Sequence, residues 1–212
     1  MLFNRHVRFL ERLPLPSEED LRRTPQFYRA DPELVRKSGN ALLARFLDAA
    51  PLPRATRYVC VDTKVHMLMP GFHACIPGWH CDDFHRPGGA APDLEGIERA
   101  WSDHVLLVVG DTALPEFAKG PLTLPAPREL AAASRPLYGV YHELIEQLRP
   151  EREAPASGQM VAFSCLDFHR GTPATRRGWR LFARITASDH REPRNEVRTQ
   201  TQVYLTQPFE QW

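Results

Sequence analysis

Residues 77–83 read Pro77-Gly78-Trp79-His80-Cys81-Asp82-Asp83, and their spacing is the most informative feature of the chain. His80 and Asp82 stand two positions apart, so on a β-strand both side chains would point to the same side, while Cys81 points outward. Asp83 is a competing carboxylate, but strand alternation directs it away from His80. The spacing therefore predicts that an imidazole and a carboxylate face one interior together.

A second histidine, His169, occurs 89 positions after His80. Two imidazoles and one carboxylate on one face of a metal ion leave the opposite coordination positions open. Arg180 and Arg184 follow His169 by 11 and 15 positions, after a turn that contains Gly and Pro. A guanidinium can capture a carboxylate through two parallel hydrogen bonds. The pattern predicts a metal site with an arginine clamp for an acid beside it.

The H-x-D pair, the distal histidine and the arginine that follows resemble the Fe(II)/2-oxoglutarate-dependent dioxygenase superfamily. The resemblance covers about residues 59–187 and implies an α+β chain with a double-stranded β-helix (jelly-roll) core. It implies Fe(II) on His80, Asp82 and His169, the 5-carboxylate of 2-oxoglutarate on Arg180, and O2 as a cosubstrate. The implied reaction converts 2-oxoglutarate to succinate and CO2 while a substrate C–H bond is hydroxylated.

The substrate is less specified than the site. Residues 77–83, together with Asp103-His104-Val105-Leu106-Leu107, look like small oxygenases of phage and bacterial type. Arg184 could bind the other carboxylate of 2-oxoglutarate, an acidic substrate or only solvent. Lys64 and His66 alternate on an expected strand and could face the cosubstrate or substrate. His85 lies in a Gly-rich loop, residues 85–92, that is a candidate lid over the site.

Other functions remain open from the sequence. Two histidines and a carboxylate also suit Zn²⁺, and cupin-type barrels hold other metals, which would give an isomerase or a hydrolase. Arg180 argues against a hydrolytic zinc site, which has no need of a carboxylate clamp. A third alternative is a non-catalytic module that senses 2-oxoglutarate. Without a metal, His80 and Asp82 would only cap a turn and His169 would be an ordinary hydrogen-bonded strand residue.

Composition bounds the partners and the number of domains. The 212 residues suit one domain, with 1–57 as a helical N-terminal brace and 58–212 as the jelly-roll core. The net charge of +1 lacks a broad basic footprint, which favours a small-molecule substrate over a nucleobase in DNA, the main alternative within the superfamily. No apolar run approaches the length of a transmembrane helix. The absence of a secretory leader and of any C-x-x-C motif predicts a cytoplasmic protein with reduced cysteines. The sequence does not specify an oligomeric state.

The expected elements follow from caps and periodicity. Ser17 and Asp31 are expected N-caps, the second opening a helix over 32–49 that continues through Gly39. A helical region over 127–149 is broken at Pro136, with Leu144, Ile145 and Leu148 packed inward. Strands are expected at 58–69, 101–109, 159–165, 179–187 and 198–205.

Overall fold

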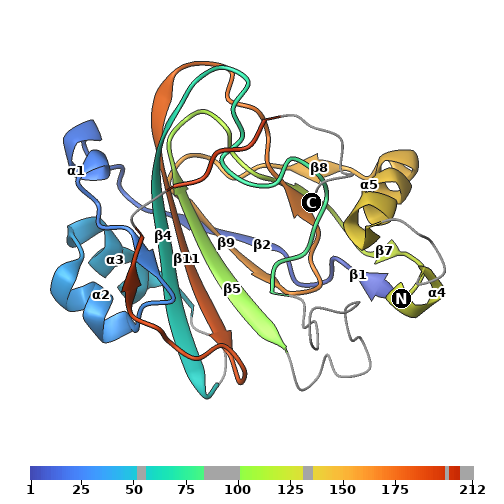
Figure 1. Cartoon of the computed structure of the whole chain (residues 1–212), viewed down its shortest axis with the longest axis horizontal. Helices are drawn as coiled ribbons and strands as arrows, with labels where there is room; N and C mark the ends of the chain where they lie inside the picture. The colour runs from blue at the N-terminus through green and yellow to red at the C-terminus, as the bar shows by residue number, and fades with distance from the viewer. Residues whose placement is uncertain (52–55, 84–100, 131–135, 199–200, 206–212) are drawn as a thin grey trace.

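The main element of the fold is a five-stranded antiparallel sheet, shown in Figure 1, a computed structural model that describes residues 1–51, 56–83, 101–130, 136–198 and 201–205. Its strands lie in the order β2 (Arg8–Arg12), β9 (Gln159–Ser164), β5 (Ser102–Val109), β11 (Gly178–Ser188) and β4 (Tyr58–Leu68). Every neighbouring pair is antiparallel. The expected mixture of helices with a largely antiparallel sheet is confirmed.

Three N-terminal helices cover one face of this sheet: α1 (Glu18–Arg22), α2 (Pro32–Ser38) and α3 (Ala41–Ala49). Alternate residues of β11 explain the contact, because Leu181, Ala183 and Ile185 share one buried cluster with the apolar side of α3. The helices therefore brace the outside of the sheet, as their apolar stripe predicted.

A second, smaller sheet covers the other face, with strands in the order β10 (His169–Arg170), β6 (Glu116–Ala118) and β8 (Arg152–Glu153). Phe117 of β6 packs against Leu106 and Phe163 of the main sheet. The next residue, Ala118, points the opposite way, into a cluster with Ile145 of α5 (Leu137–Leu148). The layers are thus helices, main sheet, second sheet and α5.

Short elements complete the chain. β1 (Leu2–Phe3) pairs with β7 (Leu122–Thr123), and β3 (Phe27–Tyr28) pairs with β12 (Glu196–Val197). α4 (Pro127–Leu130) precedes α5. No helix within the described ranges is long and apolar enough to cross a membrane. Residues 1–57 are more than a helical brace, because β2 forms an edge of the main sheet.

The strands expected at 58–69, 101–109, 159–165 and 179–187 are confirmed, and so are the caps. Ser17 accepts a hydrogen bond from the Asp20 amide, and Asp31 accepts one from Glu33. The helical region over 127–149, with its break before α5, is also confirmed.

Three expectations about the elements are wrong. The helix over 32–49 is two helices, since Gly39 is extended at the end of α2 and Asn40 caps α3. Leu148 lies on the solvent side of α5 and is 55% exposed. Among the described residues of 198–205 there is no strand, only one bridge between His73 and Tyr204. Side-chain and single backbone contacts hold this segment instead, such as the Thr201 hydroxyl donating to Gln26.

The Asn40 cap provides a stability test. Its side-chain oxygen accepts from the Leu43 amide at 3.1 Å, and its amide group donates to Thr24 at 2.8 Å. An Asn40→Ala variant should lose about 1 kcal/mol of unfolding free energy, measured as a lower urea midpoint at an unchanged slope. Arg45→Ala, on the exposed side of α3, is the matched control. Equal midpoints for the two variants would show that the break between α2 and α3 does not depend on this cap.

Candidate metal centre

The segment that carries the H-x-D pair is not a regular strand, which corrects the sequence-based expectation. The amide of His80 donates to the carbonyl of His169, and the amide of His169 donates back, each at 3.0 Å. This is an isolated bridge, and Asp82 already lies in a bend. Asp83 takes a positive φ of 56°, which turns the chain away from any further pairing. The backbone bridge nevertheless brings two histidines that are distant in sequence side by side.

The side chains around the bridge converge on one point. The Nε2 atom of His80 lies 3.9 Å from Oδ1 of Asp82, and Nε2 of His169 lies 3.4 Å from Oδ2. One ligand atom from each of the three residues falls within 4.8 Å of the others. The three residues predicted from spacing are therefore assembled, although the segment lacks a strand ladder.

Cys81, between the two ligand candidates, points to the other side, as expected, but it is buried and not solvent-exposed. It belongs to the cluster between the second sheet and α5, together with Trp79. The hydroxyl of Tyr138 on α5 donates to the Cys81 carbonyl at 2.8 Å. Helix α5 thus holds the backbone from which His80 and Asp82 project.

Both histidines are oriented by hydrogen bonds at their other ring nitrogen. Nδ1 of His80 lies 2.7 Å from the carbonyl of Gly78, and Nδ1 of His169 lies 3.1 Å from the carbonyl of Asp167. A carbonyl only accepts, so each Nδ1 carries a proton and each Nε2 is the ring nitrogen that faces Asp82. This is the arrangement that metal-binding imidazoles use to fix their tautomer.

Electrostatics favour the same protonation states. Burial, reinforced by His169, lowers the pKa of His80 to about 4, so this imidazole is neutral at pH 7. Burial alone would raise the pKa of Asp82, but the Arg184 guanidinium and His169 outweigh it and hold that pKa well below its usual range. A neutral imidazole and an ionised carboxylate are the forms that bind a metal.

Arg184 contacts protein carboxylates. Its guanidinium donates to Asp82 and lies 3.5 Å from Asp62 and 3.4 Å from Asp83. Asp83 is in turn paired with Arg191. These contacts do not support the roles that the sequence left open for Arg184, which were binding to 2-oxoglutarate, to an acidic substrate or to solvent. They indicate instead that Arg184 orients the Asp82 carboxylate.

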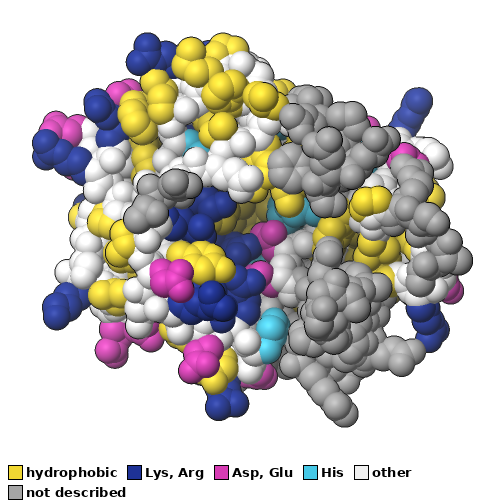
Figure 2. Space-filling model, viewed as in Figure 1, with side chains coloured by type: hydrophobic (Ala, Val, Ile, Leu, Met, Phe, Trp, Pro, Cys, Tyr) yellow, Lys and Arg dark blue, Asp and Glu magenta, His cyan; other side chains and the backbone are white. Residues whose placement is uncertain are grey.

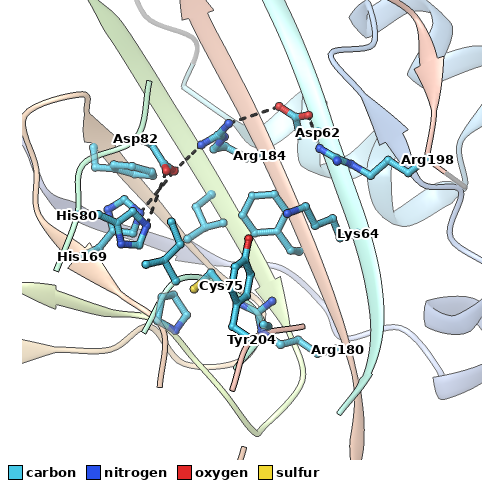
Figure 3. Close-up of a pocket in the computed structure, with 16 residues that line it drawn as sticks. Asp62, Lys64, Cys75, His80, Asp82, His169, Arg180, Arg184, Arg198 and Tyr204 are labelled. Atoms are coloured by element: carbon cyan, nitrogen blue, oxygen red, sulfur yellow. Dashed lines mark hydrogen bonds and ion pairs between the residues drawn. The ribbon is translucent and has the colours of Figure 1, made fainter. Parts of the chain in front are cut away.

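The three converging residues line one part of a cavity of about 180 Å³ between the two sheets. Figure 3 shows Asp82, His80 and His169 on one side, Lys64 across from them, and Arg180 near Cys75 and Tyr204 at a third position. Arg180 and Arg184 come from the same face of β11, four residues or about 13 Å apart along the strand. Both predicted arginines thus face the cavity that the candidate ligands face.

Arg180 is buried without a partner for much of its guanidinium. Its side chain is 1% exposed, and its Nε and Nη1 atoms have no hydrogen bond within the part of the chain that the structure describes. Burial lowers the pKa of Arg180, and no carboxylate among the described residues compensates for the lost hydration. A buried guanidinium with unsatisfied donors is suited to binding an acid.

The structure separates the remaining histidines and reveals cavity residues that spacing did not indicate. Lys64 lines the cavity, but His66 does not; its Nε2 lies 3.1 Å from the carbonyl of Gln202. His73 forms bridges with Pro173 and Tyr204. His85 and the loop 85–92 lie outside the described residues. Four titratable residues that line the cavity were not predicted from the sequence: Asp62, Cys75, Arg198 and Tyr204. Alternation could have indicated Asp62, since it shares a strand face with Lys64.

Comparison with known proteins adds little to this geometry. No family model matches the sequence, and no curated protein matches it. Among solved structures, the chain is similar to the crystal structure of an oxidoreductase of the 2OG-Fe(II) oxygenase family from Burkholderia pseudomallei, at 13% identity and a TM-score of 0.37. The match covers 83% of this chain and 79% of that one. A likeness at this level decides neither fold nor function, which rest on the chain's own residues.

Proposed function

We propose that the protein is an Fe(II)- and 2-oxoglutarate-dependent oxygenase that hydroxylates a C–H bond of a small molecule. One observation carries the proposal: a single cavity presents two imidazole Nε2 atoms and a carboxylate together, and the same cavity holds a buried guanidinium that lacks an acid. A hydrolytic zinc site would use the two imidazoles and the carboxylate but would not require a buried guanidinium at Arg180.

The residues fit Fe(II). His80 and His169 offer Nε2 atoms whose direction is set by the carbonyl groups behind the rings. Asp82 offers an ionised oxygen held in place by Arg184. Two nitrogens and one oxygen on one side of the ion leave coordination positions toward the cavity for other ligands. These three residues would hold the metal, and Arg184 would keep the carboxylate in position.

The residues also fit 2-oxoglutarate. This dicarboxylate would have one end at the metal and its 5-carboxylate on Arg180, whose unpartnered Nε and Nη1 atoms are donors that lack an acceptor. Apolar side chains of Leu106, Phe163 and Phe182 line the cavity and limit the access of water. Iron and 2-oxoglutarate, when bound, supply the O2 chemistry: one oxygen atom enters the substrate C–H bond, and the other enters succinate as CO2 leaves.

The proposal extends to the fold. The bridge from His80 to β10 extends the second sheet to four members, and β4, β11, β5 and β9 form a four-stranded core of the main sheet. Two four-stranded antiparallel sheets packed face to face are the architecture of a jelly roll. The strand order supports a double-stranded β-helix, with β2 as an additional edge strand.

Arg180 provides the direct test of the proposed function. Anaerobic protein is titrated with Fe(II) and then with 2-oxoglutarate, and the weak visible charge-transfer band of the chelate is recorded. The wild type should develop the band, and Arg180→Met should need at least about tenfold more 2-oxoglutarate, because it loses a charge-assisted pair of hydrogen bonds. Arg177→Met, at an exposed site, is the matched control.

The outcomes separate the alternatives. Metal binding without a 2-oxoglutarate band would point to a zinc-type or cupin-type enzyme. A band that is unaffected by Arg180→Met would leave the metal site but remove Arg180 from cosubstrate binding. A wild type that binds no metal would reduce the three converging side chains to a structural cluster.

A further inference from the structure

Lys64 is a basic residue that lines the cavity and has no ionic partner among the described residues or in the proposed cosubstrate. It lies on β4, directly opposite Phe182 of β11, and Figure 3 shows its ammonium directed into the cavity. Its Nζ lies 5.7 Å from the centroid of the Phe182 ring. It has no hydrogen bond or ion pair with any residue that the structure describes. The Lys64 side chain is half-buried, and a lysine ammonium that faces a cavity usually has an anion beside it.

Of the other basic side chains of the cavity, two are paired with protein groups and one is assigned to the proposed cosubstrate. Arg184 contacts Asp82 and two further carboxylates, as described above. Arg198 donates to Asp62 at 2.9 Å and to a backbone carbonyl at 3.1 Å. Arg180 is assigned to the 5-carboxylate of 2-oxoglutarate under the proposed function. Lys64 is therefore left for a third ligand.

The charge balance of the cavity indicates that this third ligand is negatively charged. Four basic side chains line it against two acidic ones, Asp62 and Asp82. The +2 charge of Fe(II) and the −2 charge of 2-oxoglutarate cancel, so the excess of positive charge would persist in the loaded site. Burial, followed by Arg198 and Arg184, lowers the pKa of Lys64. Figure 2 shows basic side chains around the hollow in the viewed face, with acidic and histidine side chains beside them.

We infer that the substrate is a small acid whose carboxylate or phosphate group binds the ammonium of Lys64. This inference rests on the proposed function. Lys64, Arg180 and the His80–Asp82–His169 group occupy three separate positions around the cavity (Figure 3). 2-Oxoglutarate would join two of them. A substrate anchored on Lys64 would extend its carbon skeleton over the Phe182 ring toward the metal, which places a C–H bond where the oxidation occurs.

The test compares an acid with its uncharged amide. Anaerobic protein loaded with Fe(II) and 2-oxoglutarate is titrated by calorimetry with butyrate, with inorganic phosphate and with butyramide. Wild-type protein should prefer at least one of the two anions over butyramide. Lys64→Gln should weaken that anion about tenfold or more and leave butyramide unchanged, since only the charge-assisted contact is lost.

Two further variants serve as controls. Lys37→Gln, at an exposed position of α2, should bind the anion like wild type. Lys64→Arg keeps the positive charge and should retain the preference for the anion, which separates loss of charge from loss of folding. Circular dichroism of each variant checks that the fold is intact.

Several results would overturn the inference. Wild-type protein that binds both anions no better than butyramide would do so, and so would a Lys64→Gln variant with unchanged anion affinity. If Lys64→Gln instead weakens 2-oxoglutarate in the charge-transfer titration, Lys64 serves the cosubstrate. Failure of the proposed function is recognised separately, by the absence of that band in wild type. In that case the same anion titrations on metal-free protein still decide whether Lys64 holds an acid.

Discussion

An Asp82→Asn variant is expected to remain folded and to lose at least about 100-fold in affinity for Fe(II). The amide has nearly the shape of the carboxylate but lacks its charge, and Asp82 is the only anionic group among the three converging side chains. The two imidazoles would remain, oriented by Gly78 and Asp167, but two neutral ligands hold a divalent ion weakly. Anaerobic equilibrium dialysis with Fe(II) measures the affinity directly, and the release of succinate from 2-oxoglutarate should fall in parallel.

The control for this variant is Asp111→Asn, which removes an exposed carboxylate that pairs with Arg176 and should leave metal affinity unchanged. Asp83 is the other carboxylate that could be the metal ligand in place of Asp82. In the structure it contacts Arg184 and Arg191 and does not converge with the imidazoles. If Asp82→Asn binds Fe(II) like wild type while an Asp83→Asn variant does not, the ligand assignment made from strand alternation is wrong.

An Arg184→Met variant is expected to lose about 3 to 5 kcal/mol of stability, the largest effect on folding of any substitution considered in this protein. Arg184 is buried and stands among three carboxylates, those of Asp62, Asp82 and Asp83. Methionine fills a similar volume but leaves negative charges close to one another with too few cations. Urea unfolding monitored by circular dichroism measures the loss, provided that the variant shows the wild-type slope.

Arg184→Lys distinguishes charge from geometry in this network. One ammonium preserves the net charge but cannot reach three carboxylates in the planar fork that a guanidinium provides, so it should recover only part of the stability. It should also bind Fe(II) more weakly than wild type, since Asp82 loses the group that orients it. A loss below about 1 kcal/mol in Arg184→Met would show that the carboxylates find other partners and that the network contributes little.

Part of the candidate metal centre could be predicted from short-range rules. H-x-D spacing places His80 and Asp82 on one side of an extended backbone, and that relation holds even though the structure has a single bridge there. Alternation along β11 likewise places Arg180 and Arg184 on one face, where they line one cavity. Hydrophobic periodicity and caps predicted most strands and helix starts for the same reason: each depends on neighbours within a few residues.

The errors arose where long-range contacts compete with local preference. Glycine alone did not show that the helix over 32–49 would break, because the break depends on Asn40 bonding both to α3 and to Thr24. The strand expected at 198–205 alternates in the sequence, yet no described strand lies beside it to complete a ladder, and Tyr204 lines the cavity. Pattern alone does not report which neighbours a segment will meet.

Local periodicity and spacing predicted the strands, the helical cover over one face and the common direction of His80 and Asp82. The antiparallel jelly-roll sheet was implied by the family resemblance, and His169 joins the other two residues through a long-range backbone bridge. The tertiary contacts define what the charged side chains do. Arg184 is paired with protein carboxylates, Arg180 is buried without an acid, and Lys64 faces the same cavity with no partner among the described residues. Those roles depend on distances between strands that are far apart in the chain, and burial makes each unpaired charge costly enough to indicate a ligand.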